Sequence, residues 1–147
     1  MFSRGIEPFV PIDVADETVL IAGPNDDGGF GPFNLPFSVL VGTNLQTQYS
    51  VGSNGGLAFG TASAAGGGLL GFTDNSIAAL GYDAFIRGAG SYVRSATIGT
   101  APNRVHIVEW TGQGSYSQTD RNVNNTFQIR IAESGEITIH YGSMGPI

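Results

Sequence analysis

Two histidines, His106 and His140, are the side chains best suited to acid–base chemistry near neutral pH. Each lies in a run of alternating apolar and polar residues, on the polar or alternate face of an expected strand. A general base or a metal ligand needs an acidic or nucleophilic partner nearby. Although the two histidines could approach each other on adjacent strands, a solvated sheet face accounts for both. We therefore expect neither of them to be catalytic.

A pair of adjacent carboxylates, Asp26 and Asp27, is the best candidate for binding a metal ion. Two glycines follow the pair, which makes the segment an acidic turn that could hold Ca²⁺. Calcium takes six to eight oxygen ligands, and the spacing of an EF-hand loop is not met here. A plain turn is therefore our first interpretation, with a structural calcium ion as the alternative. We expect no other metal and no cofactor.

Two further carboxylates, Asp74 and Asp83, lie in polar segments that follow a long glycine-rich stretch. Glycoside hydrolysis needs two carboxyl groups at a defined separation, with the pKa of one of them raised. Nothing in the sequence indicates such a pair. Because no constellation of nucleophile and base is found either, we predict that the protein is not an enzyme.

Four aromatic residues, Tyr82, Tyr92, Trp110 and Tyr116, carry apolar ring faces of the kind that stack on a sugar. Filling the core of a sandwich is the commoner use of such side chains. We favour the core interpretation, and a glycan stays as an alternative partner.

The overall charge excludes several kinds of partner. The chain has 147 residues, no cysteine and a formal net charge of −6 at pH 7. Its six basic residues are all arginines scattered along the sequence, so no basic stripe exists to meet a phosphate backbone. No apolar run approaches the roughly 18 residues that a membrane helix requires. We therefore expect no nucleic-acid partner and no membrane partner.

Period-two alternation and frequent glycines predict short strands joined by tight turns. Residues 33–41 carry apolar side chains at every second position, which marks a strand with one buried face. Pro36 cannot donate a ladder hydrogen bond, so this strand should begin at a sheet edge or a bulge. Residues 77–86 fit either a strand or a single helical turn. The other expected strands are 18–22, 45–51, 57–59, 92–98, 105–110, 127–131 and 137–141.

The last third of the chain gives the clearest prediction. Short connections and the Ser134-Gly135 turn make residues 105–141 three consecutive antiparallel strands. Strands at this spacing indicate an all-β fold, a two-layer antiparallel β-sandwich of jelly-roll type, as a single domain over residues 17–147. The expected core consists of Phe37, Val39, Val41, Tyr49, Val51, Leu57, Phe59, Val105, Ile107, Phe127, Ile129, Ile131, Ile137 and Ile139.

Five segments in order carry a family resemblance: Leu35–Val39, Tyr49–Gly60, Gly99–Trp110, Phe127–Ile131 and Gly135–Gly142. Together they resemble a β-sandwich module that recurs in secreted surface proteins of Bacteroidetes. They are also similar to modules in virion structural proteins of phages that infect aquatic bacteria. The resemblance implies display, adhesion or virion assembly, and it supplies no catalytic residue.

One segment departs from that pattern. The family often has a Trp-Asp-Asp sequence in its middle, where this chain has Leu80–Ala84. Any ion site of the family at that position therefore does not carry over. In the second of the shared blocks, Arg104 is expected to form a surface ion pair with Glu109 or Asp120.

Residues 1–16 are expected to form an extended N-terminal arm. They show no clean period, and Pro8 and Pro11 interrupt a helix and weaken a central strand. Burying each apolar side chain of the arm would contribute about 1.5–3 kcal/mol. A complete sandwich has little vacant core, so we expect a neighbouring subunit or a capsid surface to receive them. The expected partner-binding residues are Phe2, Ile6, Phe9, Val10, Ile12 and Val14.

These observations lead to one functional prediction and one alternative. The resemblance, the arm and a short chain that starts at Met1 without a signal sequence favour a bacteriophage virion structural protein. A small capsid-decorating protein is the first choice, a fibre or tail module the second, in a homo-oligomer such as a trimer. The alternative is a module of a secreted bacterial adhesin or carbohydrate-binding protein, located at the cell surface or outside the cell.

Overall fold

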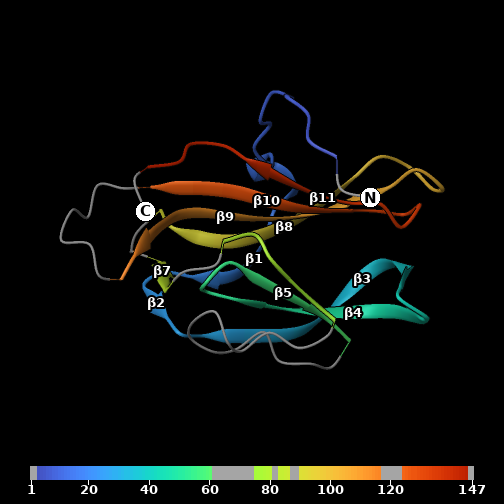
Figure 1. Ribbon diagram of the computed structural model, residues 1–147, viewed down its shortest axis with the longest axis horizontal. Coiled ribbons are helices and arrows are strands. Elements are labelled where there is room, and N and C mark those ends of the chain that lie inside the picture. Colours follow the sequence, from blue (N-terminus) through green and yellow to red (C-terminus); the bar gives the residue numbers. More distant parts are fainter. Residues whose placement is uncertain (1–2, 61–74, 81–82, 87–89, 117–123, 146–147) are drawn as a thin grey trace.

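The chain folds into two antiparallel β-sheets that pack face to face, as a computed structural model shows (Figure 1). The predicted all-β, two-layer sandwich is thus confirmed. A single turn of 3-10 helix, η1 (Val14–Asp16), is the only helical element in the described part of the chain. No helix there is long and apolar enough to cross a membrane. The structure describes residues 3–60, 75–80, 83–86, 90–116 and 124–145.

The large sheet has seven strands, and the small sheet has four. In the large sheet the order is β1-β8-β9-β10-β11, and β7 joins β2 to β9. In the small sheet the order is β3-β4-β5-β6. The large sheet comprises β1 (Thr18–Ala22), β2 (Asn25–Asp26), β7 (Ala84–Ile86), β8 (Tyr92–Ile98), β9 (Val105–Ser115), β10 (Asn125–Ala132) and β11 (Ile137–Tyr141). The small sheet comprises β3 (Gly29–Val41), β4 (Asn44–Gly52), β5 (Gly56–Phe59) and β6 (Ser76–Ala78).

Two predictions about the strands are confirmed in detail. Strand β3 lies at the edge of the small sheet, and its pairing with β4 shifts register between Asn34 and Val39, the stretch that contains Pro36. Strands β9, β10 and β11 are consecutive antiparallel neighbours. The turn between β10 and β11 places Gly135 at a φ of 94°, a conformation that glycine adopts without strain. The undecided segment 77–86 contributes to two short strands, β6 and β7.

The main core lies between the sheets and centres on an aromatic pair. Trp110 from β9 and Phe127 from β10 are fully buried and stack with ring centroids 5.2 Å apart. The Trp110 indole N–H donates to Gly52 O of the small sheet (2.9 Å), so the ring also ties the two layers together. The predicted core residues that join this cluster, fully or partly buried, are Phe37, Val39, Val41, Tyr49, Val51, Leu57, Phe59, Phe127, Ile129, Ile131, Ile137 and Ile139.

The predicted facing of β9 is wrong. Val105 and Ile107 were expected in the main core, but they belong to a separate cluster with Ile12 and Ala96. Val108 and Trp110 instead point between the sheets. The alternation was ambiguous because both faces of β9 carry apolar residues. Both faces are covered, one by the small sheet and the other by the N-terminal arm.

Candidate functional site

The N-terminal arm lies across the outer face of the large sheet. In Figure 1 it is the blue segment at the top, beyond β10 and β11 and away from the small sheet. Ile12 is buried at 5% exposure and packs with Ala96 and Ile107. Nearer the N-terminus, the Phe9 ring covers Gly142, where an added Cβ would lie 3.0 Å from the ring. The arm is therefore docked on its own domain.

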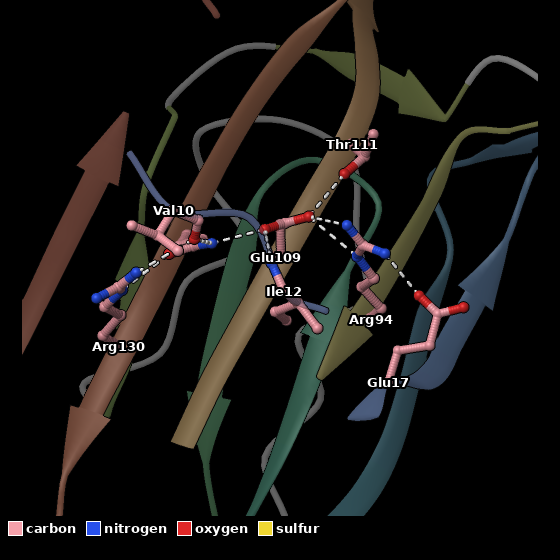
Figure 2. A network of polar contacts seen from close by, with 8 residues as sticks. Val10, Ile12, Glu17, Arg94, Glu109, Thr111 and Arg130 are labelled. Atoms are coloured by element: carbon pink, nitrogen blue, oxygen red, sulfur yellow. Dashed lines mark hydrogen bonds and ion pairs between the residues drawn. The ribbon is translucent and has the colours of Figure 1, made fainter. Parts of the chain in front are cut away.

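A buried carboxylate, Glu109, is the anchor of the arm (Figure 2). Its Oε2 accepts hydrogen bonds from the Ile12 backbone N–H (3.0 Å) and from Gln128 Nε2 (2.6 Å). Its Oε1 accepts from Arg94 Nε (3.0 Å), Arg94 Nη2 (2.6 Å) and Thr111 Oγ1 (3.1 Å). Every lone-pair direction of the carboxylate is thus occupied, as a charge with 0% exposure requires.

The sheet holds the arm through its backbone as well. Val10 O accepts from Gln128 Nε2 (2.8 Å) and from Arg130 Nη2 (3.3 Å). Arg130 Nε in turn donates to Gln128 Oε1 (2.8 Å), which fixes the orientation of that amide. These hydrogen bonds involve the Val10 carbonyl and not its side chain, as Figure 2 shows. The outer face of the large sheet therefore binds the main chain of the arm at two points, the Val10 carbonyl and the Ile12 N–H.

Arg94 completes the network at the end of the arm. Its Nη1 lies 2.6 Å from Glu17 Oε2, just before β1 begins. Burial works against the charged guanidinium, but the hydrogen bonds that it donates to Glu17 and Glu109 outweigh this effect and raise the pKa of Arg94 above its ordinary value. Arg94 and Glu109 therefore form an ion pair beneath the arm. Removing one member of such a pair leaves the other as an uncompensated buried charge.

The expected partner-binding residues differ in how far they are buried within their own chain. Ile12 is buried within its own chain and needs no other subunit to leave water. Phe9 is half-buried against the large sheet. Ile6, Val10 and Val14 are exposed at 101%, 60% and 69%. Phe2 lies outside the described residues. The outer sheet face, which the sequence does not reveal as a binding surface, thus takes up only part of the apolar arm.

The candidate metal-binding pair gains a third carboxylate. Oxygens of Asp26, Asp27 and Asp83 all lie within 4.8 Å of one another, because β2 pairs with β7 directly after Asp83. Burial and then repulsion from the other two carboxylates raise the pKa of Asp26. Asn54 Nδ2 donates to Asp27 Oδ1 (3.2 Å). Such a cluster supplies three of the oxygens that a calcium ion takes. Asp74 lies outside the described residues.

The expected placement of His106 is wrong. It is buried at 5% exposure and faces the small sheet, with Nε2 2.9 Å from Tyr49 Oη and Nδ1 2.9 Å from Thr97 Oγ1. Burial lowers its pKa to about 4, so the ring is neutral at pH 7. His140 lies on the outer face, 3.1 Å from Thr138 Oγ1. Since the two rings point to opposite faces of one sheet, they cannot act together.

The expected surface partners of Arg104 are replaced by Glu133. Arg104 Nη2 lies 2.7 Å from Glu133 Oε1, so the pair joins the residue before β9 to the residue after β10. Glu109 instead pairs with Arg94 beneath the arm, and Asp120 lies outside the described residues. The ion pair lies at the start of β9. It also connects to the small sheet, since Arg104 Nη1 donates to Pro36 O (2.9 Å).

The four aromatic residues considered for sugar stacking form no common platform. Trp110 is fully buried in the core, which confirms the core interpretation for that residue. The Tyr92 ring lies 5.0 Å from the Arg94 guanidinium, and Tyr116 is exposed with its ring at the edge of Phe85. Tyr82 lies outside the described residues.

The fold and the arm together define a class: a two-sheet β-sandwich domain whose N-terminal segment closes the outer face of its larger sheet. The chain belongs to the NIDO-related family, whose family model matches residues 1–146. That range includes the arm as well as both sheets. Comparison with curated proteins and with solved structures gives no match.

Proposed function

We propose that this chain is a non-catalytic interaction module that acts through protein–protein contacts, with the docked arm at the centre of its contact surface. The observation that carries the proposal is the exposure of Ile6, Val10 and Val14 on an arm whose backbone is already fixed. Burying each side chain in a partner would contribute about 1.5–3 kcal/mol. Because the arm is ordered beforehand, binding loses little additional conformational entropy.

The internal roles of the reactive side chains support a non-catalytic function. His106 is neutral and buried, with both ring nitrogens within hydrogen-bonding distance of Tyr49 and Thr97. Glu109 and Arg94 are buried and bonded to each other and to the arm. A general acid or base must come within hydrogen-bonding distance of a substrate. These groups instead stabilise the sandwich and position its arm.

The setting that we propose is a bacteriophage virion, where the module would decorate the capsid or form part of a fibre or tail. The capsid, another virion protein or further copies of the chain would then receive the arm. The resemblance of the strand-and-turn segments to virion modules supports this setting. The alternative is a module of a secreted bacterial adhesin, for which the same arm would contact a surface protein.

A site-specific photocrosslinker tests both the surface and the setting. The crosslinking residue would replace Val14 on the arm, and a control would replace Leu40, which is exposed at 61% on the small sheet. After irradiation in the native source, mass spectrometry would identify the attached protein. We expect one dominant product from position 14 and none from position 40. A capsid protein would support the virion, and a secreted surface protein the adhesin.

Two outcomes would contradict the proposal. Equal products from positions 14 and 40 would show that the arm is not the contact surface. The absence of any product from position 14, in a protein shown to be folded by circular dichroism, would show that the exposed arm has no partner there.

A further inference from the structure

A pocket lies at the open edge of the sandwich, where the two sheets part. Its volume is about 510 Å³, within the range of small-molecule sites. One wall comes from β1 and β8 of the large sheet, and the other from β3 and β4 of the small sheet. Both β1 and β3 are edge strands, so no further strand of the described residues closes this side. Asp16 at the end of the arm and Ala96, which packs against Ile12, also line it, whereas the cluster of aspartates does not.

The inner part of the pocket is apolar and aromatic. Phe33, Leu20 and Leu35 line it, and the Phe33 ring lies 5.7 Å from the Tyr49 ring. His106 lies beneath, edge-on to Tyr49 with ring centroids 5.2 Å apart. This arrangement offers the half-exposed side chain of Phe33 to a ligand, backed by the buried rings of Tyr49 and His106.

The rim of the pocket is polar. Asp16, Thr18, Asn34 and Thr97 lie around it, from both sheets and the η1 turn. The Asn34 amide oxygen already accepts from Gln48 Nε2 (3.1 Å), which fixes the amide with its nitrogen as the remaining donor. The rim therefore offers hydroxyl, amide and carboxylate groups within one opening.

The charge of the pocket is small. His106 holds no proton at neutral pH because it is buried. Asp16 is the one carboxylate among the lining residues, and no lysine or arginine lines the opening. An anionic ligand would thus meet a carboxylate without a compensating cation, which disfavours phosphates and sulfates.

We propose that this pocket binds a neutral saccharide unit. A pyranose ring has an apolar face that suits Phe33, and hydroxyl groups at its edge that suit Asn34, Thr97 and Asp16. An apolar aromatic wall with a polar rim that holds one carboxylate and no cation fits a neutral polyhydroxylated ligand better than a purely apolar or an anionic one. The inference does not use the exposed arm residues Ile6, Val10 and Val14, because none of them lines the pocket.

The test is a titration of the isotope-labelled full chain, followed by NMR. The probes are methyl β-galactoside, methyl β-glucoside, methyl α-mannoside and N-acetylglucosamine, with methylammonium as a cationic probe. We expect at least one sugar to shift the amide signals of Asn34, Ser95 and Thr97 with millimolar affinity. Phe33→Ala should weaken that binding about tenfold. Asn34→Ala, at an exposed position, should weaken it as well.

A matched control is Leu40→Ala, which removes an exposed apolar side chain elsewhere on β3 and should leave sugar binding unchanged. Three results would overturn the proposal. None of the four sugars shifts the pocket signals, the shifts persist undiminished in both pocket variants, or methylammonium shifts these signals more strongly than every sugar. The last result would identify Asp16 as the centre of a cation site.

Discussion

At the scale of single residues, the buried side chains Glu109 and His106 stabilise the fold in different ways. Glu109 is charged and fully hydrogen-bonded, whereas His106 is buried in its neutral form. The desolvation of a charge must be compensated by partners, while a neutral imidazole needs only two hydrogen bonds. Each side chain therefore responds differently to substitution and to pH.

Replacing the anchor of the arm should be strongly destabilising. Glu109→Gln would leave Arg94 buried with only Glu17 as its charged partner. We expect the free energy of unfolding to fall by about 3 kcal/mol, in the range measured for broken buried pairs. Urea denaturation provides the measurement. The matched control is Glu133→Gln in the more exposed pair with Arg104, which should change the midpoint little. Equal effects would show that the buried network is not an anchor.

The stability contributed by His106 should disappear in acid. Its pKa is about 4 in the folded protein, against an ordinary value of 6.5. The unfolded chain therefore binds the proton first, so the contribution is complete above about pH 6.5 and is lost as the pH falls towards 4. Over that window we expect a loss of about 3 kcal/mol from this group.

Urea denaturation at pH 7 and pH 4.5 checks this expectation. His106→Gln should reduce the difference in stability between the two pH values, whatever its effect at pH 7. His140→Gln serves as the control for a histidine on the outer face and should leave most of the difference in place. An NMR titration in which the His106 ring protonates near pH 6.5 would contradict the assignment.

At the scale of elements, the arm behaves as an additional layer on the large sheet. Ile12 contacts β9, the Val10 carbonyl contacts β10, and the Phe9 ring lies against Gly142, which directly follows β11. The two prolines keep the segment extended and out of the sheet. The arm therefore covers β9 from outside, as the small sheet covers it from inside.

Deleting residues 2–14 should weaken the sandwich without abolishing it. The deletion exposes Ile107 and removes the Ile12 N–H from Glu109. Loss of one buried apolar side chain and of one hydrogen bond to a charge amounts to about 3–5 kcal/mol. Thermal and urea denaturation would measure it. Ile12→Ala should reproduce about half of the effect, and Ile6→Ala, at a fully exposed position, should have none. A deletion as stable as the full chain would show that the arm is only a tail.

At the scale of the whole molecule, charge restricts the choice of partner. The chain carries a net charge of −6 and has a sequence pI of about 4.5. Of its arginines, Arg94 and Arg104 are paired with glutamates, which leaves little positive charge to meet a polyanion. The contact surfaces that we propose are the exposed apolar side chains of the arm and the pocket, which holds a single carboxylate, Asp16.

We therefore expect no measurable binding to DNA or RNA at physiological salt. Fluorescence anisotropy with labelled single-stranded and double-stranded oligonucleotides provides the measurement. Micromolar affinity with a steep dependence on salt concentration would contradict it. A basic protein of similar size is a suitable positive control.

The sequence by itself determined which segments are strands. Alternation at period two, together with glycine and proline at the turns, identified residues 18–22, 92–98 and the three strands after residue 104. Those signals are local, because the pleat fixes the period and a turn fixes the reversal. The short strand β2 was not predicted, and the segment of β6 and β7 was left open between strand and helical turn, since two or three residues are too few to show a period.

Only the tertiary structure decided which face of β9 points inward. Its apolar residues occupy both faces, and a local pattern cannot rank two faces that are both covered. The covering segment lies far away in sequence: Ile12 and Glu109 are 97 residues apart. Partners on other strands also hid the pairing of Arg94 with Glu109, 15 residues apart, and the burial of His106 beside Tyr49, 57 residues apart. Long-range packing determines these partners, because it determines which polar groups are buried away from water and therefore need a hydrogen bond within the protein.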